Sequence, residues 1–194
     1  MTTTAYRTEV TEELDGIRTV YEYMECQEAP LLAFFREVFD SHWKQIVFGP
    51  CIHGAVFEIR LTSPPKEITL LDGYLTIDVG AWHFHLCLGT HQGTQANPTA
   101  TDLATISRAS KAGFFRTRGG TCLGGSWGFR MWNGVGEQMI TIFFPNPYLD
   151  ERFKPQKPDW SRLALWNEMR FKYLPGATVW LPSETGVQPQ TAVH

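Results

Sequence analysis

The sequence lacks several features that would mark common classes of protein. It has only 4 cysteines in 194 residues, and no two of them have C-x-x-C spacing, so a structural zinc ribbon is not expected. No apolar run approaches the roughly 20 residues that span a bilayer, and a membrane protein is therefore not expected. The formal net charge of −3 gives no basic excess, so nucleic acid is not an expected partner.

The N-terminal segment, MTTTAYRTEVTEELDG, has no charged run followed by an apolar one. A secretory signal has that pattern, so we expect the protein to be cytoplasmic, with its thiols reduced. The stretch FFRTRGGTCLGG places arginines beside flexible backbone, but it lacks the lysine and spacing of a P-loop. We interpret this Gly-rich stretch as a solvated loop.

Three segments have the spacing of amphipathic helices. The first covers roughly residues 30–46. The second begins near Asn97, which serves as its cap, and Arg116 and Arg118 follow at or beyond its C-terminal end. Asp159 caps the third, which runs to about residue 174.

Short alternating runs bounded by turn residues predict strands. They cover residues 17–23 as an edge strand, 55–61, 68–79 with a turn at Asp72-Gly73, 82–88, and the two arms of a hairpin around Asn133-Gly134. Tight turns between strands imply antiparallel pairing. We expect an α+β fold: a single domain at 16–180, with a mainly antiparallel sheet and about three helices packed on it. A flexible N-terminal segment at 1–15 and a mobile C-terminal tail at 181–194 flank it.

The stretch GAWHFHLCLGTHQG, residues 80–93, concentrates metal-capable side chains. In a strand, successive side chains alternate between faces. Trp82, Phe84, Leu86 and Leu88 then form an apolar core face, and His83, His85 and Cys87 form the opposite row. Three histidines and a cysteine within nine positions, in a chain with 6 histidines, favour a metal site over an incidental His-rich strand.

Distances along a strand decide which of these residues share an ion. Side chains two positions apart lie roughly 6.6 Å apart, within reach of one metal, whereas His83 and Cys87 are about 13 Å apart. Gly89 lets the chain turn back and brings His91 toward His85. We therefore predict His83, His85 and His91 as ligands, with Cys87 nearby. The alternative set is His85, Cys87 and His91.

Three protein ligands with an open position are typical of a catalytic site. Glu137 is the carboxylate expected to complete it. Asp78 is less favoured, since strict alternation puts it on the opposite face unless Gly80 bends the strand. Arg130, like Arg116 and Arg118, is a candidate for holding an anionic substrate. Imidazole-rich sites bind a divalent transition metal, and the ligand list does not choose among Zn, Fe, Cu and Ni.

The pieces WHFHLCLGTHQG, SWGFRMWNGVGEQMITIFFPNPYLD and PDWSRLALWNEMR together resemble an uncharacterised family of bacterial proteins. The resemblance covers the latter half of the chain and implies a cytosolic single-domain protein without a known function. The His-x-His alternation is also similar to cupin metal strands. Cupins place a glutamate nearby at fixed spacing, whereas this chain has Gly-Thr-His at 89–91.

Three functions follow as hypotheses. The first is a metal-dependent enzyme acting on a small-molecule ligand through an open His-rich site, with hydrolase, lyase and oxidoreductase not distinguished. The second is a metal- or tetrapyrrole-handling protein, such as a carrier, a sensor or a chelatase-like factor. The third is a metal-free binding module, in which the histidines are incidental. Each is compatible with a homodimer, because exposed sheet edges often pair.

Overall fold

A six-stranded sheet collects strands that are far apart in the sequence. The computed structural model describes residues 6–12, 16–52, 54–118 and 124–182. Within them, the strands pair antiparallel in the order β1-β2-β9-β10-β11-β3. Their bounds are β1 Arg7–Glu12, β2 Arg18–Tyr23, β3 Val47–Gly49, β9 Ala109–Arg118, β10 Trp127–Asn133 and β11 Gln138–Phe143.

The expected hairpin around Asn133-Gly134 forms as β10 and β11, which lie in the sheet together with β9. Two sequence expectations are wrong. The strand at 17–23 is an interior strand, since β1, formed within residues 1–15, pairs along its outer side. Arg116 and Arg118, expected at the end of a helix, belong to β9.

Three α-helices lie within the described residues: α1 Glu28–Ser41, α2 Thr101–Ser107 and α3 Ala164–Tyr173. Short 3-10 turns, η1 Trp43–Gln45 and η2 Trp160–Leu163, flank α1 and α3. The second helix starts later than its predicted cap Asn97, after Ala100. Asp159 caps the last helical segment as predicted, its carboxylate accepting from the Ser161 N–H at 3.1 Å.

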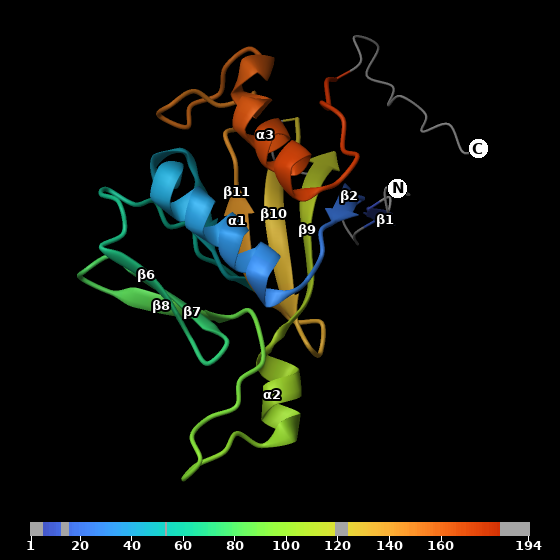
Figure 1. Cartoon of the computed structure of the whole chain (residues 1–194). Coiled ribbons are helices and arrows are strands. Elements are labelled where there is room, and N and C mark those ends of the chain that lie inside the picture. Colours follow the sequence, from blue (N-terminus) through green and yellow to red (C-terminus); the bar gives the residue numbers. More distant parts are fainter. Residues whose placement is uncertain (1–5, 13–15, 53, 119–123, 183–194) are drawn as a thin grey trace.

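Helices α1 and α3 lie across one face of the large sheet (Figure 1). The fully buried Phe34 of α1 packs against Phe114 of β9 and Phe129 of β10, with ring centroids 5.6 and 4.1 Å away. From α3, the buried Trp166 indole donates to the Gly128 carbonyl at 3.2 Å. The main core therefore sits between these helices and the central strands.

A second sheet carries the His-rich strand. It consists of β6 Glu67–Leu71, β7 Tyr74–Asp78 and β8 His83–Cys87, all antiparallel. Asp72 and Gly73 form its first turn with φ of 49° and 77°, the left-handed conformation that favours Asp-Gly. Phe84 packs on Phe39 of α1 and Phe48 of β3, which fixes this sheet beside the core. A two-stranded ribbon, β4 Cys51–Ile52 with β5 Ala55–Val56, completes the strands of the described residues.

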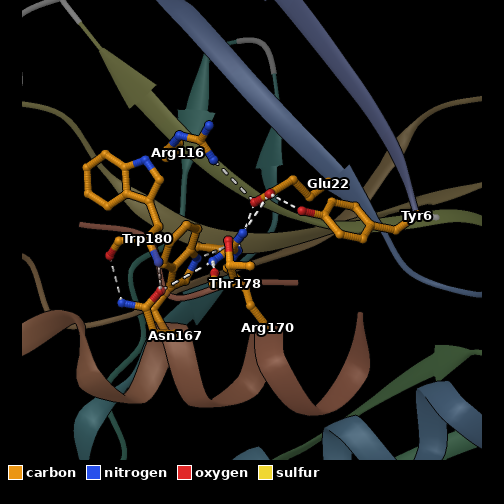
Figure 2. Close-up of polar contacts among 9 residues, drawn as sticks. Tyr6, Glu22, Arg116, Asn167, Arg170, Thr178 and Trp180 are labelled. Carbon is orange, nitrogen blue, oxygen red and sulfur yellow. Dashed lines mark hydrogen bonds and ion pairs between the residues drawn. The ribbon is translucent and has the colours of Figure 1, made fainter. Parts of the chain in front are cut away.

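A buried group of charges connects strand β2 to helix α3 (Figure 2). The Glu22 carboxylate of β2 accepts two hydrogen bonds from Arg170 of α3, at 2.8 and 2.6 Å. It also accepts from Arg116 of β9 at 3.2 Å and from the Tyr6 hydroxyl at 3.1 Å. Arg170 donates further to the Thr178 carbonyl at 3.1 Å. Burial lowers the pKa of the Arg116 guanidinium, and Glu22 opposes that change.

The prediction of a single α+β domain with a mainly antiparallel sheet and three helices is confirmed. Residues 183–194 of the predicted tail lie outside the described residues, as do His53 and Cys122. None of the helices in the described part of the chain is long and apolar enough to span a bilayer.

Candidate functional site

Strand β8 places His83 and His85 together on the exposed face of the small sheet. Phe84 and Leu86 point the other way, and Leu86 is buried in the core. The two imidazole rings lie with centroids 5.0 Å apart at an interplanar angle of 70°. The alternation of the sequence thus produces a pair of neighbouring imidazoles that solvent can reach.

Trp82 is less buried than expected for a residue of the apolar core face. It precedes β8, and 39% of its surface is exposed, although its ring stacks on Phe84 at 6.1 Å. The reason is the turn at Gly80, whose φ of 91° reverses the chain immediately before Trp82.

The same turn places a carboxylate beside the histidines. Asp78 of β7 pairs in register with His83, and Thr76 pairs with His85. Directly paired residues project from the same face of an antiparallel sheet, so Asp78 lies on the face of His83, which is the exception expected if Gly80 bends the strand. Thr76 Oγ1 lies 2.7 Å from His85 Nδ1, and Asp78 Oδ1 accepts from the Gly80 N–H at 2.6 Å.

Cys87 is on the same side of the strand, but it is buried. Its thiol donates to the Gly89 carbonyl at 3.4 Å, and only 3% of its surface is exposed. Burial raises its pKa, and a hydrogen bond with Tyr74 opposes that change. A neutral, buried thiol is a poor metal ligand, because metals bind the thiolate.

His91 is turned toward the β6–β7 turn. Its Nε2 is 3.6 Å from Asp72 Oδ2, and its ring meets the Tyr74 ring edge-on at 4.9 Å. Its Nδ1 is buried and has no hydrogen-bond partner within the described part of the chain. The predicted three-histidine set is therefore not assembled with its ligand atoms within 4.8 Å of one another. Whether His91 or Cys87 binds an ion with the other two histidines stays a prediction.

The two predicted catalytic residues have other partners. Glu137 is exposed in the β10–β11 turn, where its carboxylate accepts from the Asn133 side chain at 3.0 Å. Arg130 donates to Thr141 Oγ1 at 3.2 Å and to the Tyr21 hydroxyl, and its guanidinium lies 4.6 Å from the centre of the Phe115 ring. Both sets of contacts connect strands of the large sheet, and their catalytic role stays a prediction.

Over the described residues, one group of three side chains has ligand atoms within 4.8 Å of one another: Glu37, His42 and Glu168. The Lys172 ammonium lies 2.7 Å from the Glu37 carboxylate, which also accepts from the Tyr173 hydroxyl. These two contacts lower the pKa of Glu37 against the opposing effect of burial. A lysine already supplies the positive charge here, so the group is better explained as a contact between α1 and α3.

A cavity of about 400 Å³ opens beside the start of β10 and the end of β11. Its lining includes Trp127, Phe144, Arg162 and Arg60, and none of the histidines among the described residues. Sequence reasoning missed this site, because its residues come from distant segments without a shared motif.

Ser126 also lines the cavity and lies in Gly124-Gly125-Ser126-Trp127-Gly128, which has the G-x-S-x-G spacing of a hydrolase nucleophile. That nucleophile requires a turn from a strand into a helix and a histidine base. Here the serine leads into strand β10, and its N–H donates to Thr117 Oγ1 at 2.8 Å. The motif therefore does not indicate serine hydrolysis.

Comparison with known proteins supplies a family but no function. No curated protein matches the chain. A family model described as a family of unknown function, DUF7676, matches residues 8–175, which include the large sheet, the histidine pair and the lining of the cavity. The resemblance to an uncharacterised family is thus confirmed, and the chain belongs to the DUF7676 family.

Proposed function

We propose that this protein binds a divalent transition-metal ion reversibly through the imidazoles of His83 and His85. The observation that supports the proposal most is the separation of the two rings, 5.0 Å between centroids. Imidazole nitrogens bind zinc at about 2.0–2.1 Å, which puts the centroids of two rings on one tetrahedral ion about 5 Å apart. The pair therefore needs little rearrangement to hold an ion.

The contact of His85 with Thr76 is compatible with the tautomer that metal binding requires, because the threonine hydroxyl can accept a hydrogen bond from Nδ1–H. A metal-binding histidine usually donates its other ring N–H to a neighbouring acceptor. With His85 Nδ1–H donated to Thr76 Oγ1 across 2.7 Å, the lone pair of Nε2 is available to the metal. Thr76 also fixes the orientation of the ring.

The remaining coordination positions are open to water or to a small-molecule ligand. Asp78, in register with His83, is the carboxylate best placed to join after a side-chain rotation. Two exposed protein ligands exchange an ion easily, whereas catalytic sites usually supply three and exclude water. This favours a metal-handling role, such as a carrier or sensor, over a metal-dependent enzyme. Zn, Cu, Ni and Fe all suit imidazole ligands.

Isothermal titration calorimetry with Zn²⁺ and with Ni²⁺, on protein without a His-tag, tests the proposal. We expect one ion per chain, with binding lost in His83→Gln and in His85→Gln. The His42→Gln variant is the matched control, because His42 belongs to the other candidate group. His91→Gln and Cys87→Ser determine whether either residue adds a ligand.

The proposal is wrong if His85→Gln binds as tightly as the natural chain. Loss of binding in His42→Gln, with binding retained in His83→Gln, would move the ion to Glu37 and Glu168. Absence of binding in the natural chain would favour the metal-free binding module.

A further inference from the structure

The cavity beside β10 and β11 is a second candidate site, independent of the histidine pair. Its volume of about 400 Å³ falls within the range of small-molecule sites, roughly 300–1,000 Å³. None of His83, His85, Cys87 and His91 lines it. Its walls come from β3, from the ends of β10 and β11, and from the segments 58–60 and 145–162.

Aromatic side chains form most of the apolar wall. Trp127 belongs to β10, Phe143 to β11 and Phe144 to the residue after β11, and Phe153 lines the cavity from the loop 145–162. Trp127 is held by Trp160 and Trp180, with ring centroids 6.2 and 5.9 Å away. Flat, rigid walls of this kind favour a planar aromatic ligand.

A buried donor in this wall has no acceptor among the residues that the structure describes. Trp127 is 3% exposed, and its indole Nε1 has no hydrogen-bond partner among them. The indole N–H is a donor only, and a buried donor without a partner is rare in folded proteins. Trp127 lines the cavity, and a shift of the side chains around its indole would let a ligand oxygen there accept from this N–H.

The charges of the lining favour an anion. Arg60, Arg162 and Glu58 are its charged residues, which leaves one positive charge in excess. Arg162 donates its Nε to the Asn146 carbonyl at 3.1 Å, so the guanidinium is positioned while its terminal N–H groups have no acceptor among the described residues. A guanidinium matches a carboxylate in geometry as well as in charge.

Arg60 lies over an aromatic ring at the same site. Its guanidinium carbon lies 3.1 Å from the centre of the Phe153 ring. Phe153 has a φ of 60°, and the turn that holds it is closed by Asp150, whose carboxylate accepts from the N–H groups of Arg152 and Lys154 at 2.8 Å. The loop thus holds an aromatic ring and a cation together beside the cavity.

We propose that this cavity binds a small aromatic monocarboxylate. Its ring lies among Trp127, Phe144 and Phe153, and its carboxylate pairs with Arg162 and accepts from the Trp127 indole. The excess of a single charge selects a monoanion over inorganic phosphate, and the apolar walls select an aromatic acid over acetate.

Nuclear magnetic resonance of ¹⁵N-labelled protein tests this with 2-naphthoate as the probe. Each of the 7 tryptophans gives one indole N–H resonance, and Trp127→Phe identifies the one from Trp127. We expect that resonance to shift saturably with 2-naphthoate, and much less with the neutral 2-naphthamide, inorganic phosphate or acetate. Arg162→Met should weaken binding roughly tenfold to a hundredfold, as expected for loss of a charged hydrogen bond.

Arg36→Met is the matched control, because Arg36 is exposed on α1 and does not line the cavity. It should bind 2-naphthoate like the natural chain. Circular dichroism and thermal unfolding verify that Arg162→Met is folded. Equal binding of naphthoate and naphthamide, unchanged affinity in Arg162→Met, or a Trp127 resonance that responds only to phosphate or to no probe would each overturn the proposal.

Discussion

Glu22 and Arg170 are separated by 148 positions in the chain and form a two-point ion pair in its interior, with distances of 2.8 and 2.6 Å. Their side chains are 6% and 3% exposed. Arg116 is the second arginine on the same carboxylate. The single carboxylate of Glu22 therefore compensates two guanidinium groups. It stabilises the large sheet through Arg116 and the attachment of α3 through Arg170.

We predict that Glu22→Gln is strongly destabilising. It leaves the buried guanidinium of Arg170 and the partly buried one of Arg116 without a counter-charge, and breaking a buried pair costs about 3–5 kcal/mol. Urea denaturation followed by circular dichroism measures the free energy of unfolding. The control is Glu12→Gln, which removes the exposed pair with Arg18 and should cost less than about 1 kcal/mol. Similar losses in both variants would contradict this account.

The second prediction concerns the aromatic core. Phe34→Ala removes a fully buried ring that contacts Phe114, Phe129 and Tyr173, and should lower the free energy of unfolding by about 3–5 kcal/mol. Phe171→Ala, on α3, removes a ring that is 70% exposed and should change it by less than about 0.5 kcal/mol. The same denaturation experiment compares them, and a small loss in Phe34→Ala would mean that α1 packs differently.

The loop after β8 should loosen in acid. The Asp72 carboxylate accepts from the N–H groups of Gln92 and Gly93 at 2.8 Å, and these bonds lower the Asp72 pKa. Because the folded pKa lies below the ordinary one, the stabilisation is present above the ordinary value of 3.8 and is lost as the pH falls through the folded pKa.

Hydrogen-exchange protection factors of the Gln92 and Gly93 amides, corrected for the intrinsic effect of pH, report that change. Asp72→Asn should reduce the same two protection factors at neutral pH. Protection that is unaffected by either the acid or the substitution would show that other contacts hold the loop.

Cys26 should react slowly with alkylating reagents. Burial raises its pKa from 9.0 to about 11, so at pH 8 the reactive thiolate is about a hundredfold scarcer than in an unperturbed thiol. The stabilisation that comes from keeping the Cys26 thiol protonated is fully present below its ordinary pKa of 9.0. It is lost as the pH rises through the folded-state pKa of about 11. Peptide mass spectrometry after iodoacetamide treatment measures the rate. The chain in urea is the control, and equal rates in the folded and unfolded chain would refute the prediction.

The sequence predicts the elements with simple periodicity and misses those buried on both faces. The Asn133-Gly134 pair was sufficient to predict the hairpin of β10 and β11. The alternation of β8 was sufficient to predict that His83 and His85 lie side by side. Strand β9 has no such alternation, because Phe114 and Phe115 point to opposite faces and both are fully buried. A central strand of this kind lacks a polar face, and its pattern resembles the end of a helix.

The candidate sites differ in the same way. The histidine pair follows from local spacing within one strand. The cavity combines Arg60, Trp127 and Arg162, and their proximity depends on pairings between distant segments. Likewise, the sequence around Glu22 gives no sign that this glutamate is buried. Its burial depends on Arg170, which lies 148 positions later in the chain.

The position of Glu22 also constrains when the protein can fold during translation. Strand β2 lacks its neighbour β9 in the sheet until β9 has left the ribosome, and the counter-charge on α3, Arg170, lies 52 residues beyond the end of β9 at Arg118. Until β9 emerges, the nascent chain therefore exposes the unpaired edge of β2, a state in which chaperones or other strands readily bind.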